Sequence, residues 1–475
     1  MKELDSALPV RTVREALAAT GESPPAWIVG GSVRDALLGR PLKDVDLAVE
    51  GDAEPVAKGI AKAIRGPVFQ LSGAFGAWRV VGDGGAWFVD VSTLQGPGIE
   101  QDLAQRDFTV NAMAVPLAGG DVIDPHGGRA DLEAGVLRVL PGAYEADPLR
   151  PLRMVRFATQ LALVPDEETE RLTSEYAARV PEAAGERVFA ELRHVIAADR
   201  VAEGIELADR LSVLAAVMPE LAALHGVEQS QFHHLDVHGH TLEVLRELIG
   251  VERDLESVFG DDVAQRLQAV LEEPLADDLT RGQALRLAAL LHDVGKPATR
   301  DVLPNGRVTF IAHDKVGEEL VTGVCRRLRT SERLREFLGK ITRHHLMLGF
   351  MVHEMPLTRA AAYRYLTTTE PVEIEVTLLT CADRLATRGK NAEKAIALHL
   401  ELARELMAHA LDWRASGPPR APVKGDELAR ELGIPRGPEI GHLLRRLEEA
   451  RFTGEAESRE QAIALARRLR ENSAP

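Results

Sequence analysis

The chain has 475 residues, of which 45% are hydrophobic and 27% charged, and its formal net charge is −16. This length exceeds what one hydrophobic core normally supports, and it predicts two to four domains of an ordinary globular type. The acidic charge argues against nonspecific coating of nucleic acid, because phosphate contacts need lysine and arginine, but it leaves room for a local basic surface.

No segment predicts a membrane span or a secretory signal. The apolar run at 285–291 is far too short to cross a bilayer, and the charged N-terminus lacks the apolar stretch of a signal peptide. Cys325 and Cys381 are the two cysteines, which excludes a disulfide framework and a cysteine-based metal site. We therefore expect a cytoplasmic protein without a membrane partner, and an oligomer is possible.

The chain changes character near Asp147. Before it, short runs rich in β-branched residues and separated by glycines are typical of strands; they lie at 26–30, 45–49, 67–71, 77–81 and 87–93. After it, apolar residues recur with helical spacing. We predict an α/β domain with a mixed sheet at 1–140, followed by three all-α domains at 141–225, 226–412 and 413–475. The last of these includes the Pro-rich linker 416–422.

The segment 28–51 holds the densest chemistry of the chain. A predicted strand ends at Gly30 and Gly31, and Ser32 is expected to cap a short helix. Glycines let the backbone approach a phosphate closely, and a helix N-terminus presents free N–H groups to it. Arg34 adds the donors of a guanidinium group, so this segment predicts a phosphate-binding loop.

Asp44 and Asp46 follow this loop at positions i and i+2 of a predicted strand, so both carboxylates lie on one face. Asp90, in the run at 87–93, can add a third carboxylate from a neighbouring strand. Oxygen ligands of this kind hold Mg²⁺, and two such ions activate an attacking hydroxyl and stabilise a leaving pyrophosphate. An isolated Asp-X-Asp pair is weak evidence, and its position behind the glycine loop is what predicts a two-metal transferase site.

These motifs resemble those of the class II tRNA nucleotidyltransferase and bacterial poly(A) polymerase family, within the DNA polymerase beta superfamily. The segment 105–115 is similar to the family's ribose-selecting motif. In it, Arg106 and Asp107 are expected to form an ion pair, and Asp107 and Asn111 offer groups suited to a ribose hydroxyl. The glycine-rich segment 123–140 resembles a motif thought to coordinate movement of the family's head and neck.

Arg150, Arg153 and Arg156 recur every third residue, which places them along one helical face, and Asp147 lies one turn before Arg150. The resemblance implies that Asp147 and Arg150 read the Watson–Crick edge of incoming CTP or ATP, and that Arg153 and Arg156 face phosphates or brace the helix. Cytosine and adenine both present an amino donor beside a ring acceptor. This chain has Ala146 where the family usually has a glutamate that orients the reading pair, so the order of CTP and ATP stays open.

His240, the pair His292-Asp293 and Asp383 occur in the order typical of HD metal-dependent phosphohydrolases, which the region 226–412 resembles. The His-Asp pair follows an apolar helix, so both side chains are expected to project from its end. The resemblance implies a site for Mn²⁺, Ni²⁺, Mg²⁺ or Fe²⁺. Further groups that can contact a phosphate or bind a second metal are Lys296, His313-Asp314 and His344-His345.

The tail resembles the family's C-terminal segment. Gly437-Pro438 predicts a helix start, and Arg445, Arg446 and Arg451 form a basic stripe suited to tRNA; a packed terminal helix pair is the alternative. Together the motifs imply a Mg²⁺-dependent enzyme that adds CMP and AMP from CTP and ATP to the 3′ end of tRNA. The alternatives are an enzyme that adds only CC, only A or a poly(A) tail, and an HD phosphohydrolase acting on RNA ends or nucleotides.

Overall fold

The structure is a computed structural model, and it describes residues 2–18, 24–72, 76–229, 235–387 and 392–471. The chain forms two compact units, Met1–Val217 and Met218–Pro475, which are described separately. The predicted boundaries at 140, 225 and 412 subdivide these units and stay predictions. Among the described residues, no helix combines the length and the apolar character that crossing a bilayer requires.

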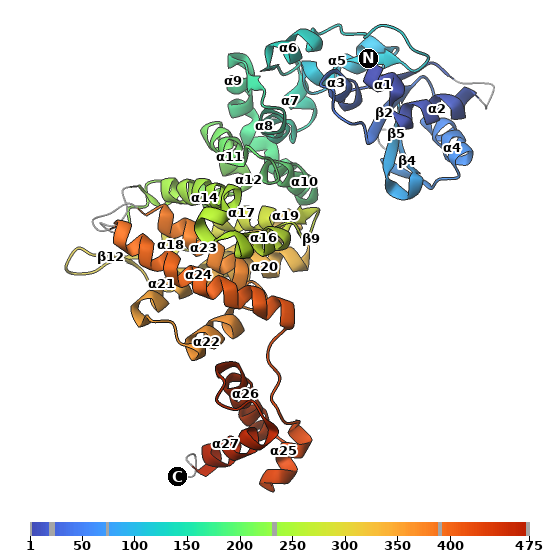
Figure 1. The fold of residues 1–475 in the computed structure, drawn as a ribbon. Coiled ribbons are helices and arrows are strands. Elements are labelled where there is room, and N and C mark those ends of the chain that lie inside the picture. Colours follow the sequence, from blue (N-terminus) through green and yellow to red (C-terminus); the bar gives the residue numbers. More distant parts are fainter. Residues whose placement is uncertain (1, 19–23, 73–75, 230–234, 388–391, 472–475) are drawn as a thin grey trace. The chain divides into compact units, whose positions relative to one another are not determined.

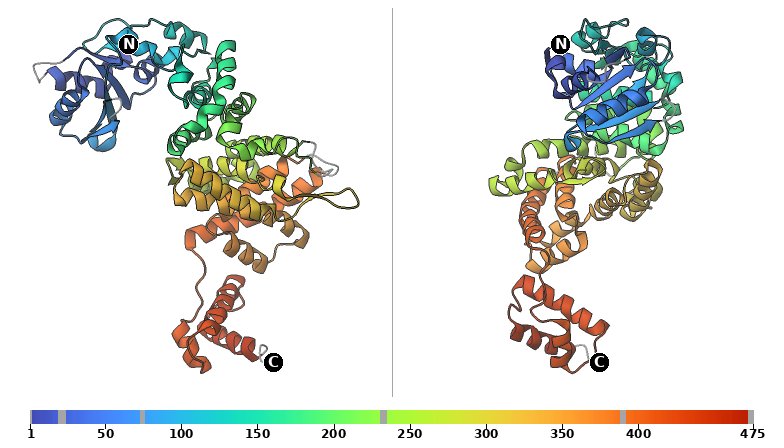
Figure 2. Two further views of the ribbon diagram at one scale, coloured as in Figure 1. Left: turned by 180° about the vertical axis from the view of Figure 1, so that it is seen from behind. Right: turned by 90° about the vertical axis from the view of Figure 1, so that its right-hand side faces the viewer.

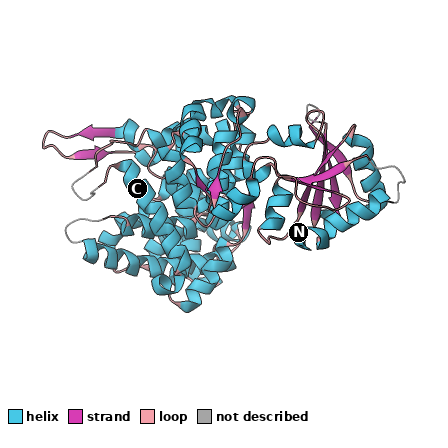
Figure 3. Ribbon diagram, turned by 90° about the horizontal axis from the view of Figure 1, so that it is seen from above, coloured by secondary structure: helices cyan, strands magenta, loops and turns pink. Residues whose placement is uncertain are grey.

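A six-stranded mixed sheet organises the first unit (Figures 1 and 3). Its strand order is β3-β4-β5-β2-β1-β6; β2 and β5 are parallel, and the other neighbours are antiparallel. The strands are β1 (Ala26–Val29), β2 (Asp44–Val49), β3 (Val68–Ser72), β4 (Ala77–Gly82), β5 (Trp87–Thr93) and β6 (Ala114–Pro116). The mixed α/β fold and its five predicted strands are confirmed. The short strand β6, which begins at the end of the 105–115 motif, was not predicted.

Helices pack on this sheet because their apolar side chains recur with helical spacing. The helices are α1 (Lys2–Ser6), α2 (Leu8–Ala18), α3 (Gly31–Leu37) and α4 (Ala53–Ile64), and α5 (Ile99–Ala104) follows β5 along the chain. Val13 of α2 and Ile60 of α4 share one buried cluster with Val45 and Val89 of the sheet. Burying one such side chain contributes about 1.5–3 kcal/mol, so this core holds β2 and β5 in fixed positions.

The rest of the first unit is mainly helical, and the prediction of an all-α domain at 141–225 is wrong at one short strand, β8 (Val164–Pro165). Its elements are α6 (Gly128–Ala134), α7 (Ala143–Ala146), α8 (Arg150–Leu161), α9 (Glu167–Tyr176), α10 (Gly185–Ile196), α11 (Val201–Arg210), α12 (Val213–Val217) and the paired short strands β7 (Val136–Leu137) and β8 (Val164–Pro165). Pro151 lies in the first turn of α8, where a missing N–H costs nothing. Leu152 and Val155 of α8 are buried near Leu192 and Ile205, so α8 is anchored by α10 and α11.

The second unit is a helical bundle, visible from two sides in Figure 2. Its helices are α13 (Pro219–Ala222), α14 (Val237–Arg253), α15 (Leu255–Phe259), α16 (Asp261–Leu271), α17 (Arg281–Leu291), α18 (Lys296–Thr299), α19 (His313–Leu328), α20 (Glu332–His344), α21 (Met347–Met351), α22 (Arg359–Thr369), α23 (Glu373–Leu385) and α24 (Ala392–Ser416). The prediction that this region is entirely helical is wrong at two hairpins. They are β9 (Pro274–Ala276) with β10 (Leu279–Thr280), and β11 (Arg300–Val302) with β12 (Val308–Phe310).

The tail contains three helices: α25 (Gly425–Leu432), α26 (Pro438–Thr453) and α27 (Arg459–Glu471). They enclose a separate core that includes Leu428, Leu443 and Ile463. Two tail helices were predicted, and α25 was missed because its eight residues make barely two turns before Gly433. α26 begins at Pro438 directly after Gly437, as the sequence indicated.

A buried acidic pair in α23, Glu373 and Glu375, is expected to make the stability of the protein depend on pH. Glu375 pairs with Arg281 at 2.5 Å, whereas one oxygen of the buried Glu373 has no hydrogen-bond partner in the described structure. Burial, aided by the charge of Glu375, raises the pKa of Glu373 to about 7. The charged form therefore costs stability above pH 7, and this cost disappears as the pH falls toward the unfolded-state value of 4.5.

We expect Glu373→Gln to raise the free energy of unfolding at pH 8 by about 1–3 kcal/mol and to have little effect near pH 4.5. Denaturant unfolding at the two pH values measures the difference. Glu375→Gln is the matched control, and we expect it to destabilise the protein because it removes the partner of the buried Arg281. An equal effect of Glu373→Gln at both pH values would contradict the assigned pKa.

Candidate active site

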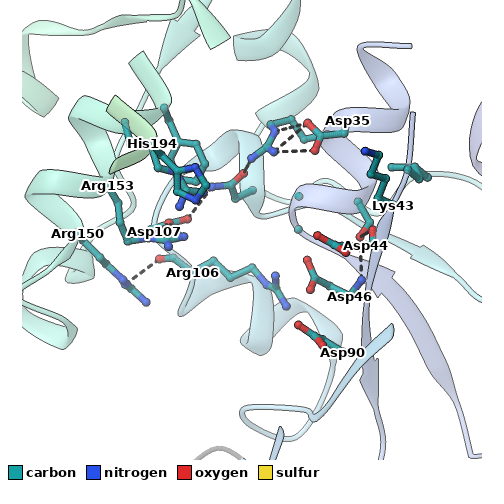
Figure 4. A pocket seen from close by; sticks show the side chains of 18 of the residues that line it. Asp35, Lys43, Asp44, Asp46, Asp90, Arg106, Asp107, Arg150, Arg153 and His194 are labelled. Atoms are coloured by element: carbon teal, nitrogen blue, oxygen red, sulfur yellow. Dashed lines mark hydrogen bonds and ion pairs between the residues drawn. The ribbon is translucent and has the colours of Figure 1, made fainter. Parts of the chain in front are cut away.

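One pocket of the first unit, of about 620 Å³, lies between the sheet and α8 (Figure 4). Every residue predicted for the transferase site lines it: Gly30, Gly31, Ser32, Arg34, Asp44, Asp46, Asp90, Arg106, Asp107, Asn111, Asp147, Arg150, Arg153 and Arg156. The pocket also contains residues that the sequence did not single out, namely Asp35, Lys43, Arg79, Phe157 and His194. Residues from distant parts of the sequence therefore form one cavity.

The three aspartates lie side by side on the parallel strands β2 and β5. Asp46 is paired in register with Asp90, and Asp44 precedes Asp46 on the same face of β2. Figure 4 shows the three carboxylates near one another, with the Arg106 guanidinium close to Asp46. Burial and the neighbouring charges of Asp90 and Asp44 raise the pKa of Asp46 to about 6, and burial raises that of Asp44.

Such crowding of negative charge is unfavourable unless a cation lies between the carboxylates. All the ligand atoms they offer are oxygens, which is the set that Mg²⁺ prefers. The arrangement of Asp44, Asp46 and Asp90 therefore fits Mg²⁺.

Arg79 holds Asp90 in place. Its Nε and Nη2 atoms each donate to one Asp90 oxygen at 2.7 Å, across directly paired positions of β4 and β5. Such a bidentate pair fixes a carboxylate geometrically and neutralises part of its charge. Arg79 occupies a half-buried position of its strand, and its pairing with Asp90 becomes visible only once the strands are in register.

The glycine loop has a conformation that requires glycine. Gly30 has φ 64° and ψ −127°, and a Cβ atom at this position would lie 2.6 Å from Arg106 Nη1. The predicted cap by Ser32 is wrong: α3 begins after Gly30, so Ser32 already lies in its first turn. Its hydroxyl instead accepts from Asp46 N at 2.8 Å and donates to Asp44 O at 3.3 Å, which ties the loop to the acidic strand.

The predicted ion pair between Arg106 and Asp107 does not form. Arg106 donates to Asp102, one helical turn earlier, at 2.9 Å, whereas Asp107 accepts two hydrogen bonds from Arg153 at 2.7 and 2.9 Å. Adjacent residues point in different directions, so each finds a different partner. Burial alone would raise the pKa of Asp107, but Arg153 and Asn111 outweigh it and hold that pKa at about 2.

Asn111 links the ribose motif to the phosphate loop. Its Nδ2 donates to Asp107 Oδ1 at 3.0 Å, and its Oδ1 accepts from Arg34 Nη1 at 2.6 Å. Arg34 also pairs with Asp35. A continuous network of polar side chains therefore runs from the glycine loop to α8, and it fixes the side chains that face the cavity.

The three arginines of α8 have different partners. Arg153 and Arg156 both donate to the buried Glu191 of α10, at 3.1 and 2.9 Å, and thus brace the helix rather than extend freely toward phosphates. Arg150 donates to the backbone carbonyls of Gln105, Arg106 and Ala143 at 2.8–3.1 Å. These three bonds use three of its five N–H groups, and two remain for a ligand.

Asp147 is oriented by Arg187, which donates to its Oδ2 at 2.7 Å, while its Oδ1 accepts from Leu149 N at 3.0 Å. Ala146 ends α7, and the carboxylate of Glu145 accepts a hydrogen bond from the Tyr176 hydroxyl at 2.5 Å. Neither residue lines the pocket. Arg187 therefore supplies the contact that fixes Asp147 in this chain.

The second unit contains a first cluster suited to a metal ion. His240, His292 and Asp293 each offer a ligand atom, and these atoms lie within 4.8 Å of one another. They come from α14 and from the end of α17, as predicted for the His-Asp pair. Asp383 of α23 joins them, because its Oδ1 lies 2.9 Å from His240 Nε2.

A second cluster shares Asp293 and adds His313 and His345. The Nδ1 atoms of His292, His313 and His345 each donate to a backbone carbonyl three residues earlier, at 2.7–2.8 Å. A neutral imidazole of this kind carries a lone pair on Nε2, which is the form that binds metals. Burial lowers the pKa of His345 to about 3, so it is neutral.

The Nε2 atoms of His313 and His345 face each other at 3.2 Å, and two lone pairs at this distance repel unless a cation joins them. The cluster therefore fits a divalent metal. Asp314 and His344, which were also predicted as candidates for a second metal or a phosphate, are not members of this cluster. Asp314 pairs with Arg343, and His344 lines an adjoining cleft.

Comparison with known proteins agrees with this geometry. Residues 26–138 match the family model "Poly A polymerase head domain", residues 163–224 match "Probable RNA and SrmB- binding site of polymerase A", and residues 237–388 match "HD domain". The chain is 34% identical to an A-adding tRNA nucleotidyltransferase of Deinococcus radiodurans, with 95% of this chain and 96% of the relative covered. It is 32% identical to a CC-adding tRNA nucleotidyltransferase of Thermus thermophilus, with 93% and 92% covered.

A third relative, a multifunctional CCA protein of Verminephrobacter eiseniae, is 31% identical over 89% of this chain and 97% of its own. In fold, the chain is similar to the Thermotoga maritima CCA-adding enzyme complexed with tRNA, with a TM-score of 0.62, 21% identity and 98% and 97% of the two chains covered. The sequence relatives and the matched models cover nearly the whole chain. It therefore belongs to the class II tRNA nucleotidyltransferase and poly(A) polymerase family, as a nucleotidyltransferase that carries an HD domain.

Proposed function

We propose that this enzyme adds CMP and AMP, from CTP and ATP, to the 3′ end of tRNA and releases pyrophosphate, in CCA addition or repair. The observation that carries the proposal is the single cavity that contains the three aspartates, the glycine loop and the Asp147–Arg150 pair. Structures similar in fold include CCA-adding enzymes in complex with tRNA, CTP and ATP, which supports these ligands. A tRNA substrate is consistent with a cytoplasmic location.

In this proposal, Asp44, Asp46 and Asp90 hold Mg²⁺. When bound, Mg²⁺ favours the deprotonated form of the attacking hydroxyl and neutralises charge on the triphosphate. The backbone at Gly30 and Gly31 approaches the phosphates, and Arg34 and Arg106 place positive charge beside them. The 3′-oxygen bonds to the α-phosphorus, its proton passes to water, and the bond from the α-phosphorus to the pyrophosphate oxygen breaks.

Base selection is assigned to Asp147 and Arg150. Asp147 accepts from an exocyclic amino group, and the two free N–H groups of Arg150 donate to the neighbouring ring acceptor. Cytosine and adenine share this pattern, whereas uracil and guanine do not. The protein thereby replaces a nucleic-acid template.

The role of Arg187 is tested by substitution. We expect Arg187→Ala to lower kcat/KM about tenfold or more and to change the ratio of C to A incorporation, because Asp147 loses the group that orients it. Arg171→Ala, which removes an exposed arginine paired with Glu168, is the control. Ala146→Glu restores the residue usual in the family, and an unchanged C to A ratio in both Ala146→Glu and Arg187→Ala would contradict an orienting role at Asp147.

The nucleotide order is decided by labelled CTP and ATP, supplied separately and together, with tRNAs that end before CCA, after C and after CC. We expect correct completion of CCA on all three substrates. Incorporation of AMP alone would indicate an A-adding specialist, like the Deinococcus relative. CMP alone would indicate a CC-adding enzyme, and long AMP tracts a poly(A) polymerase.

A second activity, hydrolysis of phosphate esters on RNA ends or nucleotides, is favoured by the paired metal clusters. Beside them lies a pocket of about 250 Å³ that contains Asp293 and Asp383 together with Lys296 and Arg384. The two carboxylates can hold metal ions, and the two cationic side chains can pair with the oxygens of a phosphate group, so the pocket suits a phosphate ester. Mn²⁺, Ni²⁺, Mg²⁺ and Fe²⁺ are the candidate ions.

A further inference from the structure

We propose that an apolar cleft next to the two candidate metal clusters of the second unit binds the bases of a short RNA end. The terminal phosphate of this RNA lies at the clusters, which we call the HD clusters. This inference rests on the proposed phosphohydrolase function of the second unit, and it names the substrate class. The cleft has a volume of about 1460 Å³ and lies between the β11–β12 hairpin, the start of α19 and the segment from α20 to α21.

The cleft is continuous with the metal pocket. Lys296, His313 and Leu346 line both cavities. His313 is a member of the second metal cluster, so a molecule whose phosphate lies at the clusters extends directly into the cleft. A continuous pair of cavities, one polar and one apolar, is suited to a ligand that has a charged and a flat apolar part.

The wall of the cleft exposes large apolar side chains. Ile311 is 78% exposed and Phe350 67% exposed, the two highest values among the large apolar side chains that the structure describes. Both line this cleft, together with Phe310 and Met347. Apolar surface that stays exposed and borders a polar site indicates a ligand-binding surface rather than a defect of packing.

Positive charge lies beside these apolar groups. Lys296 Nζ is 2.6 Å from Asp293 Oδ2 and 5.4 Å from the centre of the Phe310 ring, so it connects the metal cluster to the aromatic wall. Arg307 also lines the cleft, and its side chain makes no hydrogen bond or ion pair with the described residues. Cations next to aromatic rings bind a single-stranded nucleic acid, because the rings stack on bases and the cations contact phosphates.

The size of the cleft favours more than one nucleotide. Sites for small molecules usually measure about 300–1,000 Å³, and this cleft alone exceeds that range. The hairpin that forms one wall is closed by a tight turn at Asn305-Gly306, in which Gly306 has φ 78°. The wall is thus a defined element built beside the metal clusters.

The test measures binding to the full-length, Mn²⁺-loaded protein of a trinucleotide that ends in a non-hydrolysable 3′-methylphosphonate. Because this probe can also bind in the first unit, the readout is protection of the amide groups of residues 303–312 from hydrogen exchange. Methylphosphonate alone is the reference ligand. We expect the trinucleotide to protect the hairpin at far lower concentration than methylphosphonate.

The double variant Phe350→Ala, Ile311→Ala should bind the trinucleotide about tenfold or more weakly than the wild type does. Its affinity for methylphosphonate should be unchanged. Val302→Ala is the matched control, because Val302 lies on the same hairpin, is 49% exposed and does not line the cleft. Equal binding of the two ligands by the wild type, or unchanged trinucleotide binding by the double variant, would overturn the inference. If the wild type hydrolyses base-free phosphate esters yet shows no preference for the trinucleotide, only this inference fails and the phosphohydrolase function stands.

Discussion

Asp46→Asn is expected to lower nucleotide incorporation into tRNA by about 10³-fold or more, because the substituted side chain removes a charge from the centre of the three-aspartate cluster. Burial and the neighbouring carboxylates raise the pKa of Asp46, so its charge is disfavoured without a cation, as expected for the metal ligand that we propose. Radiolabelled incorporation at saturating Mg²⁺ measures the loss. We expect Asp46→Asn to fold normally, since removal of this charge relieves repulsion.

Asp52→Asn provides the matched control for that substitution. Asp52 caps α4 by accepting from Glu54 N at 3.0 Å, and asparagine caps a helix equally well, so activity should be unchanged. Phosphate-ester hydrolysis by the HD clusters should also be unaffected in Asp46→Asn. Retention of more than about a tenth of the incorporation activity would show that Asp46 is not a ligand of the catalytic metal.

The second large effect is expected at Asp293, which belongs to both metal clusters. Asp293→Asn should remove bound metal from both clusters and abolish hydrolysis, a fall of about 10³-fold or more, because both clusters lose the carboxylate that they share. Nucleotide incorporation should be unchanged. Elemental analysis of metal per chain, combined with a hydrolysis assay on nucleotide phosphate esters, measures both effects.

His345→Gln distinguishes two metals from one. His345 is a member of the second cluster only, so this variant should lose one ion and keep the ion held by His240, His292 and Asp293. The same metal content in His345→Gln and in the wild type would mean that the second cluster binds no metal. Loss of incorporation in Asp293→Asn would contradict the assignment of the two activities to separate sites.

The sequence predicted those parts of the site whose chemistry is local. The glycine loop, the Asp-X-Asp pair and the arginines spaced by three residues all lie within short segments, and the predicted residues line one pocket. The order His240, His292-Asp293, Asp383 also predicted the first metal cluster, because an apolar helix followed by His-Asp places both side chains at one helix end. Local pattern placed the His-Asp pair at a helix end, whereas His240 and Asp383 were predicted through the resemblance to HD phosphohydrolases.

Pairings between distant segments were not predictable in the same way. Arg79 meets Asp90 only because β4 and β5 pair in one register, and Glu191 meets two arginines across α8 and α10. The expected contact between Arg106 and Asp107 was wrong for the same reason, since Arg153, 46 positions later, is the partner of Asp107. Such contacts depend on packing, which a single sequence does not display.

One missed element did carry a local signal. The hairpin β11–β12 turns at Asn305-Gly306, a dipeptide strongly typical of hairpin turns, between residues suited to strands. The helical pattern on both sides concealed it. This hairpin forms a wall of the cleft beside the metal clusters, so its recognition from the sequence would have indicated that cleft.

The central claim is that the first unit transfers nucleotides to tRNA, and one measurement tests it directly. Purified full-length enzyme is given Mg²⁺, labelled CTP and ATP, and a tRNA that lacks its CCA end, and incorporated nucleotide and released pyrophosphate are counted in the same reaction. We predict one pyrophosphate for each nucleotide added to the tRNA. If no nucleotide is incorporated under these conditions while phosphate esters are still hydrolysed, the claim that the first unit is a nucleotidyltransferase is contradicted. The HD clusters would then be the principal active site.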